Sequence, residues 1–158
     1  MTTRPARPSD AETMARTTAL GFATYRAFGG SGVTPPPLTA DRVQTTLADR
    51  HTWALLAEVA GEPAGHVAFV RDWRRDDTAY LWQLFVRPAW WGTGLAGALH
   101  DAFMHEAVAR GYGGARLNTP AGQARARRFY ERRGWRVSGT TETWFDLPVV
   151  EYRCPLRS

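Results

Sequence analysis

One stretch of the chain restricts its fold more than any other: a strand-like run that passes through a glycine turn directly into a helix. It reads QLFVRPAWWGTGLAGAL over residues 83–99. The strand-like part ends before Pro88, which lacks the N–H that sheet pairing needs. Leu95, Leu99 and Phe103 then recur at helical spacing. The stretch therefore predicts a strand and a long helix joined by a short turn.

The rest of the chain alternates between strand and helix patterns without repeats or linkers. A length of 158 residues suits a single domain over residues 1–158. The predicted elements are helices at 11–28, 39–49 and 121–133, strands at 53–59, 65–70, 79–86, 115–118, 135–143 and 149–154, a hairpin turn at 61–63, and loops at 29–37 and 71–77. This order predicts a mixed α/β or α+β domain around one sheet.

The turn before the long helix has the chemistry of an anion site. Gly92 and Gly94 allow the backbone to approach a ligand closely, and the first turn of a helix offers unpaired N–H groups. A phosphate or pyrophosphate would suit it, although a tight turn that binds nothing has the same pattern. A P-loop is excluded because the chain has no lysine, and the glycine spacing does not match a dinucleotide fingerprint.

Two segments together resemble the GNAT family of N-acetyltransferases. The first is the Val86-Arg87-Pro88 step followed by the small residues Gly94 and Ala96. The second, QARARRFYERRGW over residues 123–135, is similar to the family pattern Asn-x-x-Ala-x-x-Phe-Tyr-x-x-x-Gly-Phe. Trp91 departs from the Gln or Arg usual in the turn. Gln123 and Trp135 replace Asn and Phe in the second segment.

This resemblance implies acetyl-CoA as the cosubstrate. It also implies a central mixed, mostly antiparallel sheet of about six or seven strands, flanked by about four helices. Main-chain N–H groups of the glycine turn would hold the pyrophosphate, and the strand before it would pair with the pantetheine arm. The implied cofactor contacts are Phe85, Val86, Trp91, Gly92, Thr93, Gly94, Leu95, Ala96, Asn118, Gln123, Phe129 and Arg133.

The resemblance also implies two catalytic positions. Tyr130 matches the tyrosine that protonates the departing thiolate, and a backbone N–H near Phe85 or Val86 would polarise the acetyl carbonyl. Gln83 stands where many members carry a glutamate base; glutamine cannot accept a proton usefully but can orient an amine or a water. The base is left open among His66, Asp72, Asp76, Asp77, Glu142, Asp146 and Glu151.

The expected reaction is direct attack of a primary amine on the acetyl group in a ternary complex. We expect the acceptor to be a small molecule, such as an antibiotic or a metabolite. The candidate specificity elements are the first helices and residues 29–37, 71–77 and 140–148. Peptide or protein acetylation is the first alternative. The second is a non-catalytic acyl-CoA-binding regulatory protein, which the glutamine at position 83 would suit.

Composition narrows the partners further. Every one of the 20 basic residues is arginine, against 15 acidic ones, a formal charge of +5 that brings nucleic acid into consideration. No helix-turn-helix or RNA-binding aromatic pattern supports nucleic-acid binding, so nucleic acid is an unlikely partner.

The sequence also bears on location, metal binding and assembly. No apolar run is long enough to span a membrane. A single cysteine and the lack of a secretory signal favour the cytoplasm. His100 and His105 lie on different helix faces, so no metal site is expected, and the resemblance suggests a possible homodimer.

Overall fold

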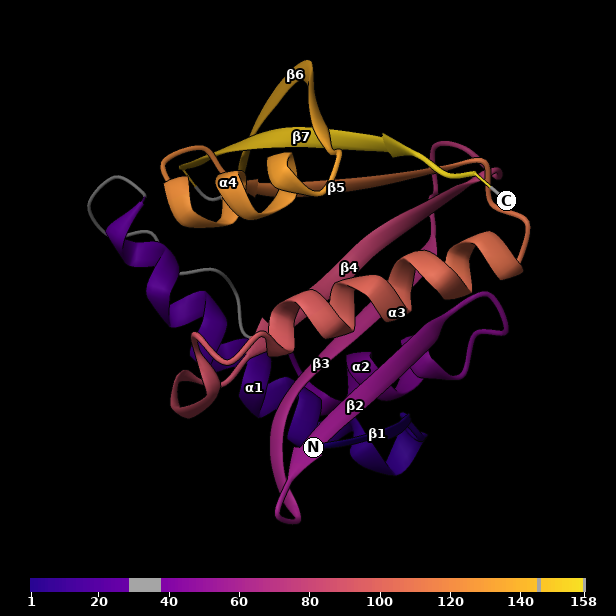
Figure 1. Cartoon of the computed structure of the whole chain (residues 1–158), viewed down its shortest axis with the longest axis vertical. Helices are drawn as coiled ribbons and strands as arrows, with labels where there is room; N and C mark the ends of the chain where they lie inside the picture. Colours follow the sequence, from indigo (N-terminus) through magenta and orange to yellow (C-terminus); the bar gives the residue numbers. More distant parts are fainter. Residues whose placement is uncertain (29–37, 145, 158) are drawn as a thin grey trace.

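A computed structural model describes residues 1–28, 38–144 and 146–157 of the chain. These residues form one seven-stranded sheet in the order β1-β2-β3-β4-β5-β7-β6 (Figure 1). Neighbouring strands are antiparallel except β4 and β5, which are parallel. The expected mixed, mostly antiparallel sheet is confirmed. The strands are β1 (Thr2–Pro5), β2 (Trp53–Val59), β3 (Glu62–Arg71), β4 (Thr78–Val86), β5 (Gly114–Pro120), β6 (Arg136–Trp144) and β7 (Leu147–Pro155).

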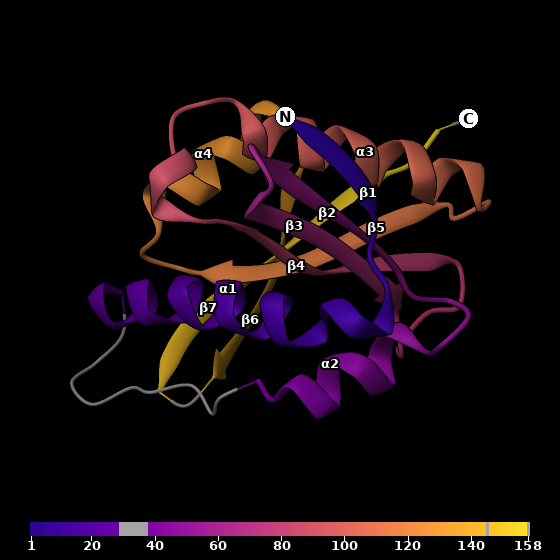
Figure 2. The same cartoon turned by 90° about the horizontal axis from the view of Figure 1, so that it is seen from below.

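Four α-helices cover the two faces of this sheet. They are α1 (Ala11–Ala23), α2 (Ala40–Leu47), α3 (Leu95–Ala109) and α4 (Ala124–Arg132), with short 3₁₀ turns η1 (Pro8–Asp10), η2 (Thr24–Ala27) and η3 (Pro88–Trp90). Helices α1 and α2 lie on one face, and α3 and α4 lie on the other (Figure 2). None of the helices in the described ranges combines the length and the apolar character needed to cross a bilayer.

The hydrophobic core follows these two layers. Under α3, the largest cluster gathers Phe69 of β3, Leu99 and Phe103 of α3, and Trp135, all at most 1% exposed. A smaller cluster forms under α1 and α2 around Met14 and Val43, neither of which is exposed. The helical spacing of the apolar residues after position 95 therefore marks the buried face of α3, as predicted.

The structure corrects three expectations from the sequence: a strand that was not predicted, the end of the first helix and the position of a hairpin turn. The strand β1 is absent from the sequence-based elements, because four residues gain strand geometry only by pairing with β2, fifty or more positions away. The predicted helix 11–28 ends at Ala23, and residues Thr24–Ala27 tighten into η2. The hairpin turn lies at Ala60-Gly61, where φ angles of 53° and 80° fit a two-residue turn, rather than at 61–63. The predicted loop 29–37 lies outside the described residues.

A β-bulge in β4 changes which side chains face α1. Phe69 of β3 is opposite Leu81, whereas Ala68 is opposite Gln83, so Trp82 is an extra residue on β4. Strand side chains normally alternate between faces, and a bulge resets that alternation. Trp82 and Gln83 consequently both pack on the α1 side, while Leu84 joins the core under α3.

Strands β4 and β5 pair over only three residues and then separate. Their register runs from Thr78 opposite Gly114 to Tyr80 opposite Arg116, and no pairing continues beyond it in the described chain. Figure 1 shows the two strands diverging toward the C-terminal end of β4. The backbone of β4 after Tyr80 therefore has an open edge inside the sheet. This edge extends to the end of β4 at Val86, and the glycine turn follows it.

Candidate active site

The glycine turn after β4 presents a row of backbone donors at the start of α3. Gly92 and Gly94 have φ angles of 76° and 84°, and a Cβ at either position would meet no atom within 4 Å. The first helical hydrogen bond runs from Ala98 N to Gly94 O at 3.1 Å. In the described chain, the N–H groups of residues 92–97 have no hydrogen-bond acceptor. Together with the positive end of the α3 dipole, they form a cradle for an anion.

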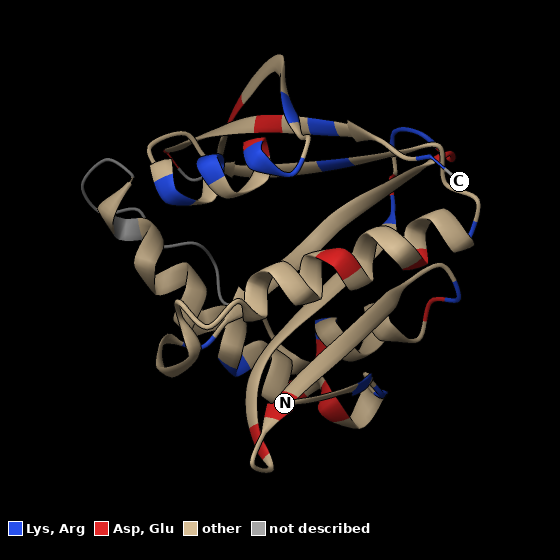
Figure 3. Cartoon of the chain, viewed as in Figure 1, with Lys and Arg blue, Asp and Glu red and all other residues tan. Residues whose placement is uncertain are grey.

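Arg133, the C-terminal cap of α4, brings a positive charge to this cradle. A Cβ at Gly97 would lie 2.7 Å from a guanidinium nitrogen of Arg133, so the guanidinium lies against the first turn of α3. The guanidinium also stacks 3.8 Å from the centre of the Phe129 ring. Figure 3 shows that basic residues recur along α4. Of the arginines in α4, Arg127 instead donates to the Tyr152 hydroxyl at 2.9 Å. The structure thus brings Arg133, Phe129 and the glycine turn together.

Thr93 and Trp91 close the turn through their side chains. The Thr93 hydroxyl donates to the Trp90 carbonyl at 2.6 Å, and the Trp91 indole N–H donates to the Val86 carbonyl at 2.7 Å. Trp91, the residue that departs from the family pattern, therefore ties the turn back to the end of β4. Leu95, by contrast, is buried at 4% exposure and anchors α3 in the core.

The hydrogen-bond pattern of β4 identifies which amide faces the opening. Arg87 N donates to Ala64 O at 2.8 Å, and Phe85 and Val86 lie opposite His66 and Gly65. Antiparallel pairs alternate between bonded and non-bonded, so Phe85 bonds to β3 and Val86 directs its backbone groups away from it. The Trp91 bond to the Val86 carbonyl agrees with this direction. Of the two amides expected to polarise the acetyl carbonyl, Val86 is the one that faces β5.

Gln83 belongs to a buried polar cluster with His66 and Thr18 on the α1 side. Its Oε1 accepts hydrogen bonds from His66 Nε2 at 2.6 Å and from Thr18 Oγ1 at 3.1 Å. Burial, which outweighs the hydrogen bond to Gln83, lowers the pKa of His66 to about 4. His66 is therefore neutral at physiological pH and a weak base. Phe85 closes the cluster by packing its ring so closely against Gly21 that a Cβ at position 21 would overlap the ring.

Tyr130 lies in the last turn of α4 and has Tyr80 of β4 and Tyr25 of η2 among its neighbours. Its ring packs edge-on against Phe129 and Trp135, with centroids 5.2 and 5.8 Å away. Burial, followed by the neighbouring Tyr25 and Tyr80, raises its pKa well above the usual value. The hydroxyl is thus protonated throughout the neutral range, and it makes no hydrogen bond within the described chain.

The two remaining cofactor candidates lie apart from the glycine turn. Gln123 immediately precedes α4, and its Oε1 accepts from Thr119 Oγ1 at 3.4 Å. Asn118 lies on β5, and its Nδ2 donates to the Tyr80 hydroxyl at 3.2 Å. Asn118 and Arg116 share the α1 side of the sheet, because Leu117 between them packs into the core under α3.

Most carboxylates proposed as a base are engaged by arginines. Asp72, 2% exposed, accepts two hydrogen bonds from Arg116 at 2.9 and 3.0 Å. Glu151, 1% exposed, is bonded to Arg153 at 2.6 Å and Arg116 at 3.3 Å. The other candidates differ in their partners: Glu142 pairs with Arg74, Asp76 pairs with Arg71, Asp77 accepts from Thr78, and Asp146 lies in the β6–β7 turn with φ of 66°. The buried pairs are held as carboxylates, an arrangement suited to structure rather than proton transfer.

The sequence-based reasoning missed Arg116 and Tyr80. Arg116 is 1% exposed and lies 4.4 Å from the Tyr80 ring centre and 4.8 Å from that of Trp73. Arg116 is one of 20 arginines, and its partner Asp72 is 44 positions away, so no local pattern marks it. Tyr80 has the alternation of an ordinary strand residue, and only the strand register shows that it lies where β4 and β5 part.

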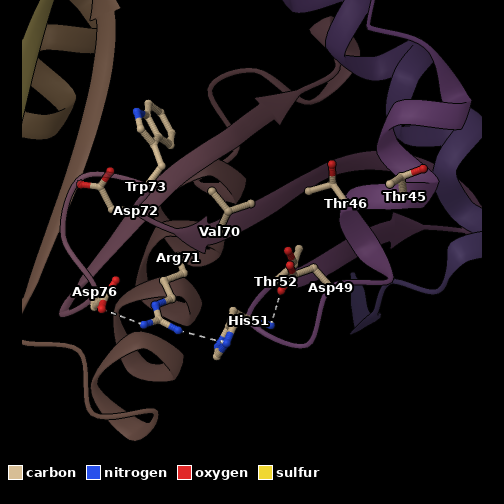
Figure 4. A pocket seen from close by; sticks show the side chains of 10 residues that line it. All are labelled: Thr45, Thr46, Asp49, His51, Thr52, Val70, Arg71, Asp72, Trp73 and Asp76. Atoms are coloured by element: carbon tan, nitrogen blue, oxygen red, sulfur yellow. Dashed lines mark hydrogen bonds and ion pairs between the residues drawn. The ribbon is translucent and has the colours of Figure 1, made fainter.

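A separate cavity of about 530 Å³ lies at the other end of β4, beside the C-terminal end of α2. Arg71 crosses it, with its guanidinium 3.2 Å from His51 Nε2 and 3.1 Å from Asp76 (Figure 4). The cavity borders the start of β4, whereas the glycine turn follows its end. At about 3.3 Å per strand residue, these two regions are roughly 25 Å apart.

Comparisons with known proteins agree with this geometry. Residues 19–135 match the family model described as "Acetyltransferase (GNAT) family". A search of curated protein sequences finds no significant match. Among solved structures, PaiA N-acetyltransferase from Thermoplasma acidophilum, in complex with coenzyme A, has a TM-score of 0.77 at 13% identity, covering 98% of this chain and 99% of that one. The ribosomal-protein-S18-alanine N-acetyltransferase from Escherichia coli has a TM-score of 0.76 at 16% identity, with 99% and 94% covered.

A third structure, YncA from Salmonella typhimurium with its cofactor acetyl-CoA, has a TM-score of 0.77 at 18% identity and covers 100% of this chain and 95% of that chain. These low identities show a shared fold, and the family model spans well over half of the chain. The glycine turn, the parting of β4 and β5, and the Phe129-Tyr130 pair all fall within the matched residues. The chain belongs to the GNAT family of acetyltransferases.

Proposed function

We propose that this chain transfers the acetyl group of acetyl-CoA to a primary amine of a small molecule. The observation that carries the proposal is the row of N–H groups at residues 92–97, which have no acceptor among the described residues and lie beside the Arg133 guanidinium. The two left-handed glycines leave open space there, and a pyrophosphate carries the charge that such a cradle binds. Solved structures of the same fold that contain coenzyme A or acetyl-CoA support the same cofactor.

In the proposed reaction, acetyl-CoA supplies an activated acetyl thioester. The Val86 N–H, directed toward the opening, donates a hydrogen bond to the carbonyl oxygen on which negative charge develops. The amine nitrogen forms the new C–N bond, the C–S bond breaks, and the Tyr130 hydroxyl gives its proton to the thiolate sulfur. The proton released from the amine restores the tyrosine through solvent. The reference pKa of tyrosine, about 10, lies above that of a thiol, about 8.5, so the tyrosine is protonated when the thiolate departs, and the proton released by the amine completes the transfer.

The aromatic rings on the α1 side of the sheet support a small amine as the acceptor. Aromatic rings of Phe22, Tyr25, Tyr80 and Phe85 lie on the α1 side, and each packs against another aromatic ring. Such a surface suits a compact, partly apolar molecule. Peptide acetylation remains the alternative outcome of the test below. The cytoplasmic location and the homodimer expected from the sequence stay predictions.

Binding and turnover can be measured separately. Acetyl-CoA at about 100 times its Kd should stabilise the fold by about 2.7 kcal/mol, a melting-temperature rise of roughly 5–10 °C. Transfer is followed by thiol release with tyramine, spermidine, a peptide with an N-terminal alanine, and an N-acetylated lysine peptide. We expect a thermal shift and fastest release with one of the two small amines. A thermal shift without release from any amine would support a regulatory acyl-CoA-binding protein instead.

Replacing Gly94 by aspartate should raise the Kd of acetyl-CoA roughly 10- to 100-fold, because a carboxylate would then face the pyrophosphate. The matched control is Gly61→Asp in the β2–β3 hairpin, where φ is 80° and a Cβ also meets no atom within 4 Å. Both variants carry the same backbone strain, so only Gly94→Asp should affect binding by isothermal titration. Equal affinity in the two variants would contradict the assignment of the cradle.

A further inference from the structure

Asn118 occupies the first stretch of β5 that has parted from β4. The last paired residues are Tyr80 and Arg116, and Asn118 follows two positions later on the same face of the sheet. That face is the α1 side, where Gln83 and His66 also lie. Asn118 on β5 and Gln83 on β4 therefore border the opening from its two sides. Both side chains lie on the face of the sheet that α1 covers, and α3 covers the other face.

The side-chain amide of Asn118 is only half satisfied. Its Nδ2 donates to the Tyr80 hydroxyl at 3.2 Å, whereas its Oδ1 is buried and has no hydrogen-bond partner in the described part of the chain. A buried carbonyl oxygen without a donor is costly, and native structures rarely keep one without a reason. The bond from Nδ2 to the Tyr80 hydroxyl holds the amide in place and leaves Oδ1 available to an N–H donor.

Tyr80 is itself held from two sides. Its ring centre lies 4.4 Å from the Arg116 guanidinium carbon and 4.9 Å from the centre of the Trp73 ring. Arg116 is in turn fixed by its two hydrogen bonds to Asp72, at 2.9 and 3.0 Å, and by Glu151 at 3.3 Å. This buried ion-pair cluster therefore fixes the Tyr80 hydroxyl, and through it the Asn118 amide.

The charges around Asn118 are balanced. Glu151, directly opposite Asn118 on β7, has its oxygens bonded to Arg153 and Arg116. Tyr80, which accepts the hydrogen bond from Asn118, is neutral at physiological pH because burial raises its pKa. A primary amine has at least two N–H bonds, so it can donate one to a neutral amide oxygen while its lone pair attacks the acetyl group.

We propose that Asn118 Oδ1 accepts a hydrogen bond from the nitrogen of the acceptor amine, and that Tyr80 is the positioning residue that holds Asn118. The proposal rests on the acetyltransferase function above and names an acceptor contact for the same site. It differs from the role implied by the family resemblance, in which Asn118 contacts the cofactor. The two roles therefore predict different effects of an Asn118 substitution on the Kd of acetyl-CoA: little change for an acceptor contact, and a rise for a cofactor contact.

The test is Asn118→Leu, which keeps the size of the side chain and removes the accepting oxygen. The amine is whichever of tyramine, spermidine and the two peptides gives wild type the highest kcat/KM. We expect kcat/KM for that amine to fall roughly 10- to 100-fold, with the Kd of acetyl-CoA within about twofold of wild type. A tenfold rise in the Kd of acetyl-CoA would make Asn118 a cofactor contact and overturn the proposal. An unchanged kcat/KM would also overturn it.

Two further variants keep the proposal testable if Asn118→Leu folds poorly. Asn118→Asp retains an accepting oxygen and should lose less kcat/KM than Asn118→Leu. Tyr80→Phe keeps the ring stacking but frees the amide, so KM for the amine should rise about three- to tenfold with little change in kcat. Tyr112→Phe is its control, since Tyr112 packs on Phe69 away from the opening. Equal KM values in these two phenylalanine variants would refute the positioning role.

The outcomes separate this proposal from the function on which it rests. If wild type shows no thermal shift with acetyl-CoA and no turnover, the proposed function fails. If wild type is active and Asn118→Leu is equally active, only the role of Asn118 fails.

Discussion

Replacing Tyr130 by phenylalanine should lower kcat by at least about 100-fold, within the range of 10²–10⁴ that general acids contribute. The substitution removes only the hydroxyl, and the ring can keep its packing against Phe129 and Trp135. Without that proton donor, the thiolate must leave unprotonated or take its proton from water. The effect should fall on kcat, while the Kd of acetyl-CoA changes little, because the cradle at residues 92–97 is untouched.

The measurement is steady-state thiol release at saturating acetyl-CoA, together with titration calorimetry of acetyl-CoA. Tyr112→Phe provides the control, because it removes a hydroxyl from a tyrosine that packs on Phe69 at the far end of α3. Since the pKa of Tyr130 is raised above its usual value, wild-type kcat should show no loss from tyrosine ionisation between about pH 7 and 9. A kcat for Tyr130→Phe within threefold of wild type would exclude this residue as the acid.

Replacing Arg116 by methionine should lower the free energy of unfolding by about 3–5 kcal/mol. Asp72 and Glu151 are 2% and 1% exposed, and removal of the guanidinium leaves both as buried charges without their common partner. Methionine approximates the length of the removed side chain, so the loss reports on charge rather than on a cavity. Arg16→Met, which breaks the exposed Glu12–Arg16 pair, should cost less than about 0.5 kcal/mol.

The pH dependence of this loss has a defined sign. In wild type, burial raises the pKa of Asp72 and of Glu151, but hydrogen bonds and charge from neighbouring arginines leave both below their usual values. Their stabilising effect is therefore present above the unfolded pKa of about 4 and is lost as pH falls through the lowered folded values. In Arg116→Met the same pKa values should rise, so the difference in unfolding free energy should be smaller at pH 5 than at pH 8. Urea unfolding followed by tryptophan fluorescence measures both, and an equal difference at the two pH values would contradict the explanation.

The order of elements and the glycine turn were predictable because their signals are local. Apolar spacing located the strands and α3, and glycine at positions 92 and 94 anticipated φ angles of 76° and 84°. The family followed from residues 83–99 and 123–135, which lie in the matched range 19–135. By contrast, β1 escaped notice because its four residues become a strand only through long-range pairing.

In the candidate site, too, local signals were predictable from the sequence and long-range pairing was not. Arg133, Phe129 and Tyr130 were placed from one continuous segment, and the structure brings Arg133 and Phe129 to the glycine turn. The preference for the Val86 amide over Phe85 could not be read from the chain, because it depends on the register with β3 and on the bulge at Trp82. No strand pattern reveals where a partner strand adds or omits a residue.

The sequence by itself determined the local geometry of this protein: where backbone torsions must be left-handed and which helix begins beside an anion cradle. It also placed Phe129 and Tyr130 on one helical segment. Only the tertiary structure decided which distant side chains meet. Arg116 reaches Asp72 and Glu151 across 44 and 35 positions, and Asn118 reaches Tyr80 across 38. The physical reason is that torsional preference and periodicity act between neighbours in the chain. A buried ion pair or an unpaired amide oxygen arises only from the register of strands that the whole fold aligns.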